Sequence, residues 1–192
     1  MISLHLLVRN EIALLPKLLS EVRPLVEEVV IVDTGSTDGT FELAKQTTPL
    51  VVSTLLNYDF GGCRNKGLEL VSEPWVLWLD ADELPNEHMK NYLIGFKRAN
   101  PQLVEGVRFV RHNLIDGRPI GDRTVEKHVR LFRKRFRFSG RIHEVLNIQG
   151  AKVIDAPGEC AIRHYKTGAR QAEQNERYMA WPEQRALIGG TA

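Results

Sequence analysis

Short apolar runs that alternate with segments of helical periodicity constrain the fold of this chain more than any other feature. Residues 29–32 and 75–79 are continuously apolar, and residues 2–8 are apolar except for Ser3 and His5, as is typical of strands buried on both faces of a sheet. Between the first two runs, residues 11–22 space their leucines at helical intervals. This alternation predicts parallel strands joined by right-handed helical crossovers, and therefore a three-layer α/β/α fold.

Further elements complete the first half of this pattern. A third strand is expected over residues 50–56, and helices are expected over residues 40–46, 64–71 and about 85–97. Asp38 stands just before the first of these helices, where a carboxylate can bind free backbone N–H groups, so we expect it to act as a cap.

The second half of the chain has longer strands that polar residues interrupt. These are expected over residues 106–115, 126–133 and 136–148, with a strong turn signal at Asp116-Gly117. Strands joined by such a turn run antiparallel. The mostly parallel sheet should therefore have a smaller antiparallel part in its second half.

The end of the chain returns to a helical pattern. A polar helix is expected over residues 168–187, and residues 189–192 should form a frayed tail. A break near Asn100-Pro101 separates two halves of the chain. We interpret residues 1–188 as one domain built from these halves.

Composition excludes several classes of protein. Of 192 residues, 43% are apolar and 26% charged, as in ordinary globular proteins, and the net charge of +2 is too small to indicate nucleic-acid binding. Two cysteines cannot form a disulfide framework, which favours a cytoplasmic location. The opening apolar run, residues 2–8, is too short for a signal peptide or a membrane span. Any membrane contact is therefore expected to be peripheral, at the inner face.

Polar residues collect where three of the predicted strands end. The first strand is followed by Arg9-Asn10-Glu11, the second by residues 33–39, and the strand at 75–79 by Asp80-Ala81-Asp82-Glu83. In open α/β sheets, ligands bind outside the carboxyl ends of the strands. The sequence therefore predicts an acidic crevice at this edge of the sheet.

Asp80 and Asp82 are the sharpest feature of this crevice. Two carboxylates two residues apart, just past a buried strand, can reach the same side of it. Mg²⁺ and Mn²⁺ prefer oxygen ligands and often bridge a carboxylate to substrate phosphates. The alternative is a solvated acidic turn, because an isolated Asp-x-Asp pair is weak as a signal.

Four segments together resemble the glycosyltransferases of family 2, which have the GT-A type of fold. They are VRNE at 8–11, VDTGSTDGT at 32–40, RNKGL at 64–68 and WVLWLDADE at 75–83. Their order and spacing also agree with that family. Downstream, RLFR at 130–133, GRIHE at 140–144 and IRHY at 162–165 resemble its lipopolysaccharide core glucosyltransferase branch.

The resemblance implies a donor site for a nucleotide-sugar in residues 1–100. Asp33 would hydrogen-bond the base, most often uracil, and Arg9 and Glu11 would lie beside the base or ribose. Arg64 would approach the base or the diphosphate, where a guanidinium makes bidentate contacts. Asp80 would contact the ribose or the sugar. The structural alternatives are a turn-forming role for Asp33 and a surface position for Arg64.

The resemblance also implies a metal ion and a catalytic base. Asp82 would ligate Mg²⁺ or Mn²⁺, and His164 is a further candidate ligand, although a lone histidine is more often structural. Glu144 is the candidate general base for transfer with inversion, and the alternative for it is a strand residue paired with an arginine. Asp116, Asp122 and Glu126 are the other carboxylates that could serve as the base.

The acceptor is expected to bind to residues 101–188. The sequence leaves open whether it is a glycan, a glycolipid or a peptide. The arginine-rich stretch at 123–141 is either a patch for an anionic acceptor or the solvated face of a strand. Two other functions are open: a sugar nucleotidyltransferase, and a non-catalytic nucleotide-sugar-binding module of a larger assembly. One departure from the family pattern is Gly61-Gly62-Cys63, which stands where a run of small Ala and Ser residues is expected.

Overall fold

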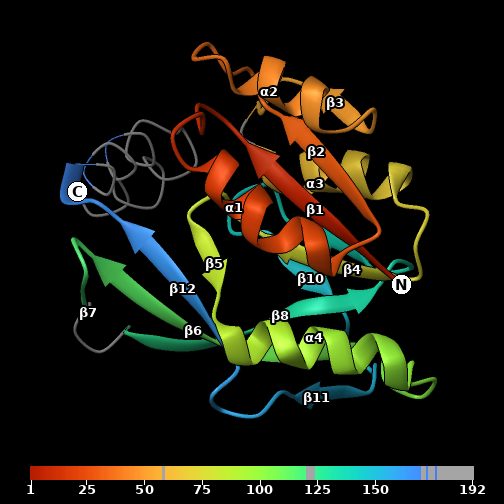
Figure 1. Ribbon diagram of the computed structural model, residues 1–192. Helices are drawn as coiled ribbons and strands as arrows, with labels where there is room; N and C mark the ends of the chain where they lie inside the picture. Colours follow the sequence, from red (N-terminus) through yellow and green to blue (C-terminus); the bar gives the residue numbers. More distant parts are fainter. Residues whose placement is uncertain (58, 120–123, 170–171, 173–175, 177–192) are drawn as a thin grey trace, which may run out of the picture.

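The first half of the central sheet is entirely parallel (Figure 1). The computed structural model describes residues 1–57, 59–119, 124–169, 172 and 176. Within them, β1 (Ile2–Val8) lies between β2 (Glu28–Asp33) and β4 (Trp75–Leu79). The short β3 (Val51–Ser53) pairs with the other edge of β2. This is the arrangement that the alternating strand and helix signals predict.

The second half of the sheet is mixed. β8 (Val125–Arg133) pairs antiparallel with β4, and β6 (Gly106–Ile115) pairs antiparallel with β8. β11 (Val153–Asp155) and β12 (Ala161–Lys166) both run parallel to β6, and β7 (Arg118–Pro119) forms a short hairpin with it. The predicted antiparallel part therefore lies in this half of the chain.

The sheet curls, because its last strand follows β4 directly in the sequence. β5 (Glu83–Pro85) begins after only three intervening residues, yet it pairs with β12 at the opposite end of the strand order. The end of the sheet formed by β12 and β5 is thus brought back beside β4, around Asp82. This closure sets residues from the two halves of the chain against each other.

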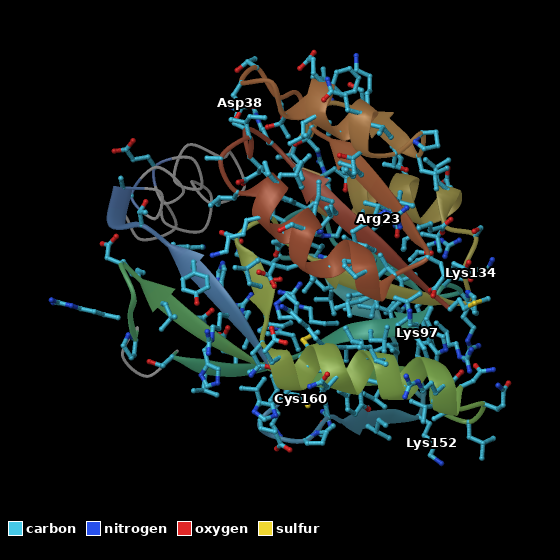
Figure 2. The ribbon with its side chains drawn as sticks, viewed as in Figure 1. Arg23, Asp38, Lys97, Lys134, Lys152 and Cys160 are labelled. Atoms are coloured by element: carbon cyan, nitrogen blue, oxygen red, sulfur yellow. The ribbon has the colours of Figure 1, made fainter. Side chains whose placement is uncertain are left out.

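Helices cover both faces of the sheet, which confirms the predicted three-layer α/β/α fold. α1 (Leu15–Val22), the 3₁₀ turn Arg23–Leu25 and α4 (Glu87–Ala99) pack on one face (Figure 1). Their apolar side chains meet Leu4 and Leu6 of β1 in the larger core. Cys160 packs beside α4 in the same core (Figure 2).

The opposite face is covered by α3 (Phe60–Leu70) and a separate hairpin. The hairpin consists of β9 (Arg137–Ser139) and β10 (Val145–Asn147). Phe138 and Leu146 of the hairpin and Leu68 of α3 pack with Val76 of β4 in a second core. α2 (Thr40–Thr47) flanks β2 and β3.

Several elements differ from the prediction. The strand expected over 50–56 is limited to β3, and the helix expected over 11–22 begins at Leu15, next to a proline at its first turn. The single strand expected over 136–148 is the β9–β10 hairpin, because Gly140 and His143 have left-handed backbone conformations that turn the chain. The expected helix at 168–187 lies largely, and the tail at 189–192 wholly, outside the described residues.

Candidate active site

A cleft opens at the carboxyl ends of β1 and β4. Its volume is about 1190 Å³, which exceeds the roughly 300–1,000 Å³ of most small-molecule sites and suits a ligand as large as a nucleotide-sugar. The first half of the chain contributes the loops after β1, β2 and β4 and the start of α3. The second half contributes residues of β6, β8 and β12 and the turn between β9 and β10. The cleft thus lies where the curled sheet closes.

Hydrogen bonds between two loops hold the polar residues that follow β1 and β2. Asn10 has a left-handed backbone, with φ of 56°, and its Oδ1 accepts the N–H of Thr37 at 2.8 Å. The N–H of Glu11 donates to Thr40 Oγ1 at 2.8 Å. Asp38, labelled beside this loop in Figure 2, accepts the Thr40 N–H at 3.0 Å at the start of α2. Asp38 therefore binds the first N–H of α2 from the position before the N-cap, which is Gly39 and not Asp38 as expected.

Asp33 ends β2 and is 2% exposed. Its Oδ1 accepts the N–H groups of Gly35 and Ser36 at 3.0 and 3.1 Å. Its Oδ2 is buried and has no hydrogen-bond partner among the described residues. A buried carboxylate oxygen without a donor is costly, so this atom fits a donor from a ligand. Thr34 and Gly35, which follow it, line the cleft.

The guanidinium of Arg64 joins the two halves of the site. Its Nη2 donates to Asp80 Oδ1 at 3.0 Å, and its Nε donates to Glu144 Oε1 at 2.7 Å. Arg64 is 5% exposed and lies over the ring of Trp78. Removing either carboxylate would leave a buried charge partly uncompensated, which is strongly destabilising.

His5 holds the backbone of Arg64 from within the sheet. Its Nε2 lies 3.0 Å from the Arg64 carbonyl oxygen. Burial, together with the charge of Arg64, lowers the pKa of His5 to about 3. The ring is therefore neutral, and its Nε2–H donates to that carbonyl.

The β9–β10 hairpin brings Glu144 to Arg64 because it docks tightly on α3. The side chain of Asn65 binds both backbone groups of Phe138, donating to its oxygen at 2.9 Å and accepting from its N–H at 2.8 Å. A Cβ on Gly61 would lie 2.4 Å from the carbonyl oxygen of Gly140. The departure from the family pattern at Gly61 therefore has a structural reason, since the hairpin approaches too closely for any side chain.

Glu83 and Arg130 form a buried ion pair behind Asp80. Glu83 is fully buried, its Oε2 accepts the Asp80 N–H at 3.1 Å, and its Oε1 also lies 3.3 Å from Arg111 Nη1. Arg130 lies over the ring of Trp78. Neither residue of this pair had a predicted role of its own. The sequence held one signal for Arg130. It stands two positions before Phe132 in β8, and because side chains alternate between the two faces of a strand, Arg130 lies on the same face as this core residue.

These ion pairs control the charge of Asp80. Burial disfavours its ionised form, but Arg64 and Arg130 outweigh burial and hold the pKa of the Asp80 carboxyl well below its usual range. Burial raises the pKa of the Glu83 carboxyl, and the nearby Asp80 adds to this, against the lowering by Arg130. Asp80 therefore remains an acceptor of hydrogen bonds at neutral pH.

Asp82 and His164 meet where β5 and β12 close the sheet. Asp82 Oδ2 lies 3.4 Å from His164 Nε2, and both side chains are largely buried. No group of three or more His, Cys, Asp or Glu side chains suited to a metal ion occurs in the described part of the chain. The two side chains fit a shared ion nevertheless, because Mg²⁺ is usually held by one or two carboxylates together with substrate phosphates.

Most of the predicted site residues line this one cleft. Those that do are Arg9, Glu11, Arg64, Asp80, Asp82, Glu144 and His164. Of the other candidate bases, Glu126 binds Arg111, Asn113 and His128, outside the lining of the cleft. Asp116 lies at the β6–β7 turn, and Asp122 lies outside the described residues.

In the described part of the arginine-rich stretch, residues 124–141, three arginines make structural contacts. Arg130 is buried, Arg133 lies over the ring of Trp75, and Arg135 forms an ion pair with Glu105. These contacts favour the structural alternative over a free patch of cations.

Comparison with known proteins identifies the family. Residues 3–166 match the model of the family described as "Glycosyl transferase family 2". The chain belongs to this family. The family expected from the four N-terminal motifs is therefore confirmed, and the match extends through β12.

Individual relatives are similar over much of this family 2 chain. A TPR repeat-containing protein of Synechococcus elongatus is 28% identical over 183 residues, which are 94% of this chain and 40% of the relative. The lipopolysaccharide core biosynthesis glycosyltransferase LpsC of Rhizobium meliloti is 28% identical over 158 residues, 78% of this chain and 58% of LpsC. This chain thus spans between two fifths and three fifths of these two proteins.

A solved structure has a similar fold. The structure of S. aureus TarS 1-349 in complex with UDP-GlcNAc aligns with a TM-score of 0.57 at 16% identity, covering 86% of this chain and 58% of TarS. At this identity the likeness concerns the fold alone, which supports the GT-A assignment. Among the described helices, none is long and apolar enough to cross a membrane.

Proposed function

We propose that this family 2 domain transfers a sugar from a nucleotide-sugar, most simply a UDP-sugar, to an acceptor hydroxyl. The observation that carries the proposal is the one cleft that Asp80, Asp82 and Glu144 all line. Asp33 is buried directly before Thr34 and Gly35, which line the same cleft. These residues come from three separate segments of the chain. Their convergence is the arrangement that binding of a donor and removal of an acceptor proton both require.

In this proposal, the donor lies along the loops after β1, β2 and β4. The unpartnered Oδ2 of Asp33 accepts an N–H of the base, and Arg9 and Glu11 lie beside the base or ribose. Asp80 accepts a hydroxyl of the ribose or the sugar, which its persistent charge favours. Arg64 acts through Asp80 and Glu144, because its guanidinium binds both of them.

Asp82 and His164 would hold Mg²⁺ or Mn²⁺ together with the donor diphosphate. When bound, such an ion supplies Lewis-acid stabilisation of the leaving diphosphate. Support comes from the short distance of 3.4 Å between Asp82 Oδ2 and His164 Nε2. Two neighbouring ligand atoms that each lie about 2.1 Å from an octahedral ion lie about 3 Å from each other.

Glu144 is the proposed general base for an inverting transfer. Its Oε1 is bound to Arg64, and the side chain lines the cleft from the turn between β9 and β10. A carboxylate there can take the proton of an acceptor hydroxyl as the new glycosidic bond forms. The same ion pair also supports the structural alternative for Glu144, and a substitution separates the two.

The acceptor is proposed to be a glycan, glycolipid or peptide that enters beside β8 and β12. The similarity to LpsC favours a lipopolysaccharide or another cell-envelope glycolipid, made at the inner membrane face.

Thermal unfolding with a panel of nucleotide-sugars, each with and without Mn²⁺, tests the proposal. A bound donor stabilises only the folded state, so the correct one should raise the Tm, and Mn²⁺ should increase the rise. UDP release should then fall by about 10²–10⁴-fold in Glu144→Gln, with donor affinity retained. Glu87→Gln, on the exposed surface of α4, is the control. A panel without any Tm shift contradicts the proposed function, and equal loss of binding and turnover in Glu144→Gln makes that residue structural.

A further inference from the structure

A chain of hydrogen bonds runs from His164 into the sheet behind the cleft. His164 Nδ1 lies 2.9 Å from Asn113 Oδ1, and Asn113 Nδ2 donates to Glu126 Oε2 at 3.0 Å. The three residues come from the adjacent strands β12, β6 and β8, and His164 is the register partner of Asn113. We propose that Asn113 and Glu126 are positioning residues that hold His164 as its Nδ1–H tautomer, with the Nε2 lone pair beside Asp82. This inference rests on the proposed metal site.

The carboxylate of Glu126 decides how the Asn113 amide is oriented. An ionised carboxylate only accepts hydrogen bonds, and the same Oε2 also accepts from Arg111 Nη2 at 2.5 Å. The atom of Asn113 that faces it must therefore be the NH₂ group. The flipped amide would place two oxygen atoms 3.0 Å apart without a proton between them.

The orientation of Asn113 in turn decides the tautomer of His164. With its NH₂ group bound to Glu126, Asn113 presents its oxygen to His164 Nδ1, which must carry the proton. A neutral imidazole carries only one N–H, so Nε2 keeps its lone pair. Nε2 is the atom that lies 3.4 Å from Asp82 Oδ2, beyond the usual hydrogen-bond range of about 2.7–3.2 Å.

This arrangement suits a histidine that ligates a cation. Metal-bound histidines almost always donate their other ring N–H to a fixed acceptor, and loss of that acceptor typically costs about 10–100-fold in metal affinity. Asn113 is 6% exposed, and neither it nor Glu126 lines the cleft, so Asn113 acts through His164, and Glu126 acts through Asn113 while also binding Arg111 and His128. The competing arrangement is a His164 that carries its proton on Nε2 and donates it to Asp82.

The tautomer can be measured without any metal or donor. Long-range ¹H–¹⁵N NMR at pH 8 distinguishes the two ring nitrogens of each of the six histidines, and His164→Gln assigns the signal. We expect His164 to be the Nδ1–H tautomer in the wild type. In Asn113→Leu, we expect a mixture of the Nδ1–H and Nε2–H tautomers instead. Val125→Ala, an exposed neighbour of Glu126 on β8, should leave the signal unchanged. A wild-type signal of the Nε2–H form overturns the inference, even if Asn113→Leu does not fold.

Mn²⁺ titration in the presence of UDP, followed by electron paramagnetic resonance, measures the consequence. Asn113→Leu should weaken Mn²⁺ binding by about 10–100-fold, Glu126→Gln should weaken it less, and Val125→Ala should not weaken it. Unchanged affinity in Asn113→Leu, with weakened affinity in His164→Gln, overturns the positioning role. Unchanged affinity in His164→Gln instead overturns the proposed metal site, and the NMR result still decides the tautomer separately.

Discussion

At the scale of single residues, the site depends on polar groups whose partners lie far away in the sequence. Arg64 binds Asp80 and Glu144, which are 16 and 80 positions from it. Asp33 binds two nearby N–H groups with one oxygen, and its other oxygen has no partner in the described part of the chain. Such buried groups are costly unless they are paired, so substitutions at them should have large and specific effects.

Asp33→Asn should weaken UDP binding without unfolding the loop. The amide oxygen still accepts from Gly35 and Ser36, but an NH₂ group replaces the Oδ2 acceptor. Loss of a hydrogen bond to a charged group costs about 1.5–3 kcal/mol, which is about 10–150-fold in Kd by calorimetry. Asp38→Asn, outside the lining of the cleft, is the matched control. A Kd within about twofold of the wild type would leave Asp33 a purely structural role.

His5→Gln should make the protein less sensitive to acid. The pKa of His5 is about 3 in the folded protein against 6.5 ordinarily, so between these pH values only the unfolded chain binds its proton. The free energy of unfolding of the wild type therefore falls as pH falls, by up to about 1.4 kcal/mol per pH unit from this group. Gln keeps a donor for the Arg64 carbonyl but does not titrate. Urea unfolding from pH 7 to pH 4 should show a shallower decline in the variant, and parallel declines would contradict a neutral, buried His5.

At the scale of elements, the sequence pattern predicts the strands and helices of the first half of the chain better than those of the second half. β1 and β4 are predicted with their observed limits because continuous apolar runs mark fully buried strands. β5, β11 and β12 were not predicted as strands, since two of them have only three residues and β12 alternates with charged residues. The β9–β10 turn was also missed, because it depends on a left-handed His143 that no local pattern indicates.

The same contrast applies to the candidate site. Asp33, Asp80 and Asp82 stand at strand ends that periodicity reveals, so they could be singled out from the sequence. Glu83 and Arg130 could not, because their ion pair depends on how β8 and β5 meet after the sheet curls.

Gly61→Ala should disrupt the docking of the β9–β10 hairpin on α3. The added Cβ would meet the Gly140 carbonyl oxygen, a backbone atom that cannot move cheaply, so we expect a loss of about 1–3 kcal/mol in the free energy of unfolding. Gly95→Ala, in α4, is the control, because nothing lies within 4 Å of its Cβ. That substitution should stabilise by about 0.5–1 kcal/mol through helix propensity. Equal effects in urea unfolding would show that the hairpin tolerates the side chain.

At the scale of the whole molecule, the curl of the sheet creates the proposed metal site. Asp82 precedes β5, and His164 lies on β12, and only the pairing of these two strands brings the side chains together. At this seam between β5 and β12, Asp82 and His164 line the same cleft as the donor loops and Glu144. The function proposed here therefore requires that donor diphosphate, metal ion and Asp82 meet at the seam.

Calorimetric titration of UDP into the wild type and Asp82→Asn, each with and without Mn²⁺, tests this requirement most directly. Asn keeps the size of the side chain and removes the charge that a cation needs. We predict that Mn²⁺ tightens UDP binding by at least tenfold in the wild type and in the control Glu87→Gln, and has no effect in Asp82→Asn. Equal enhancement by Mn²⁺ in Asp82→Asn would contradict the account.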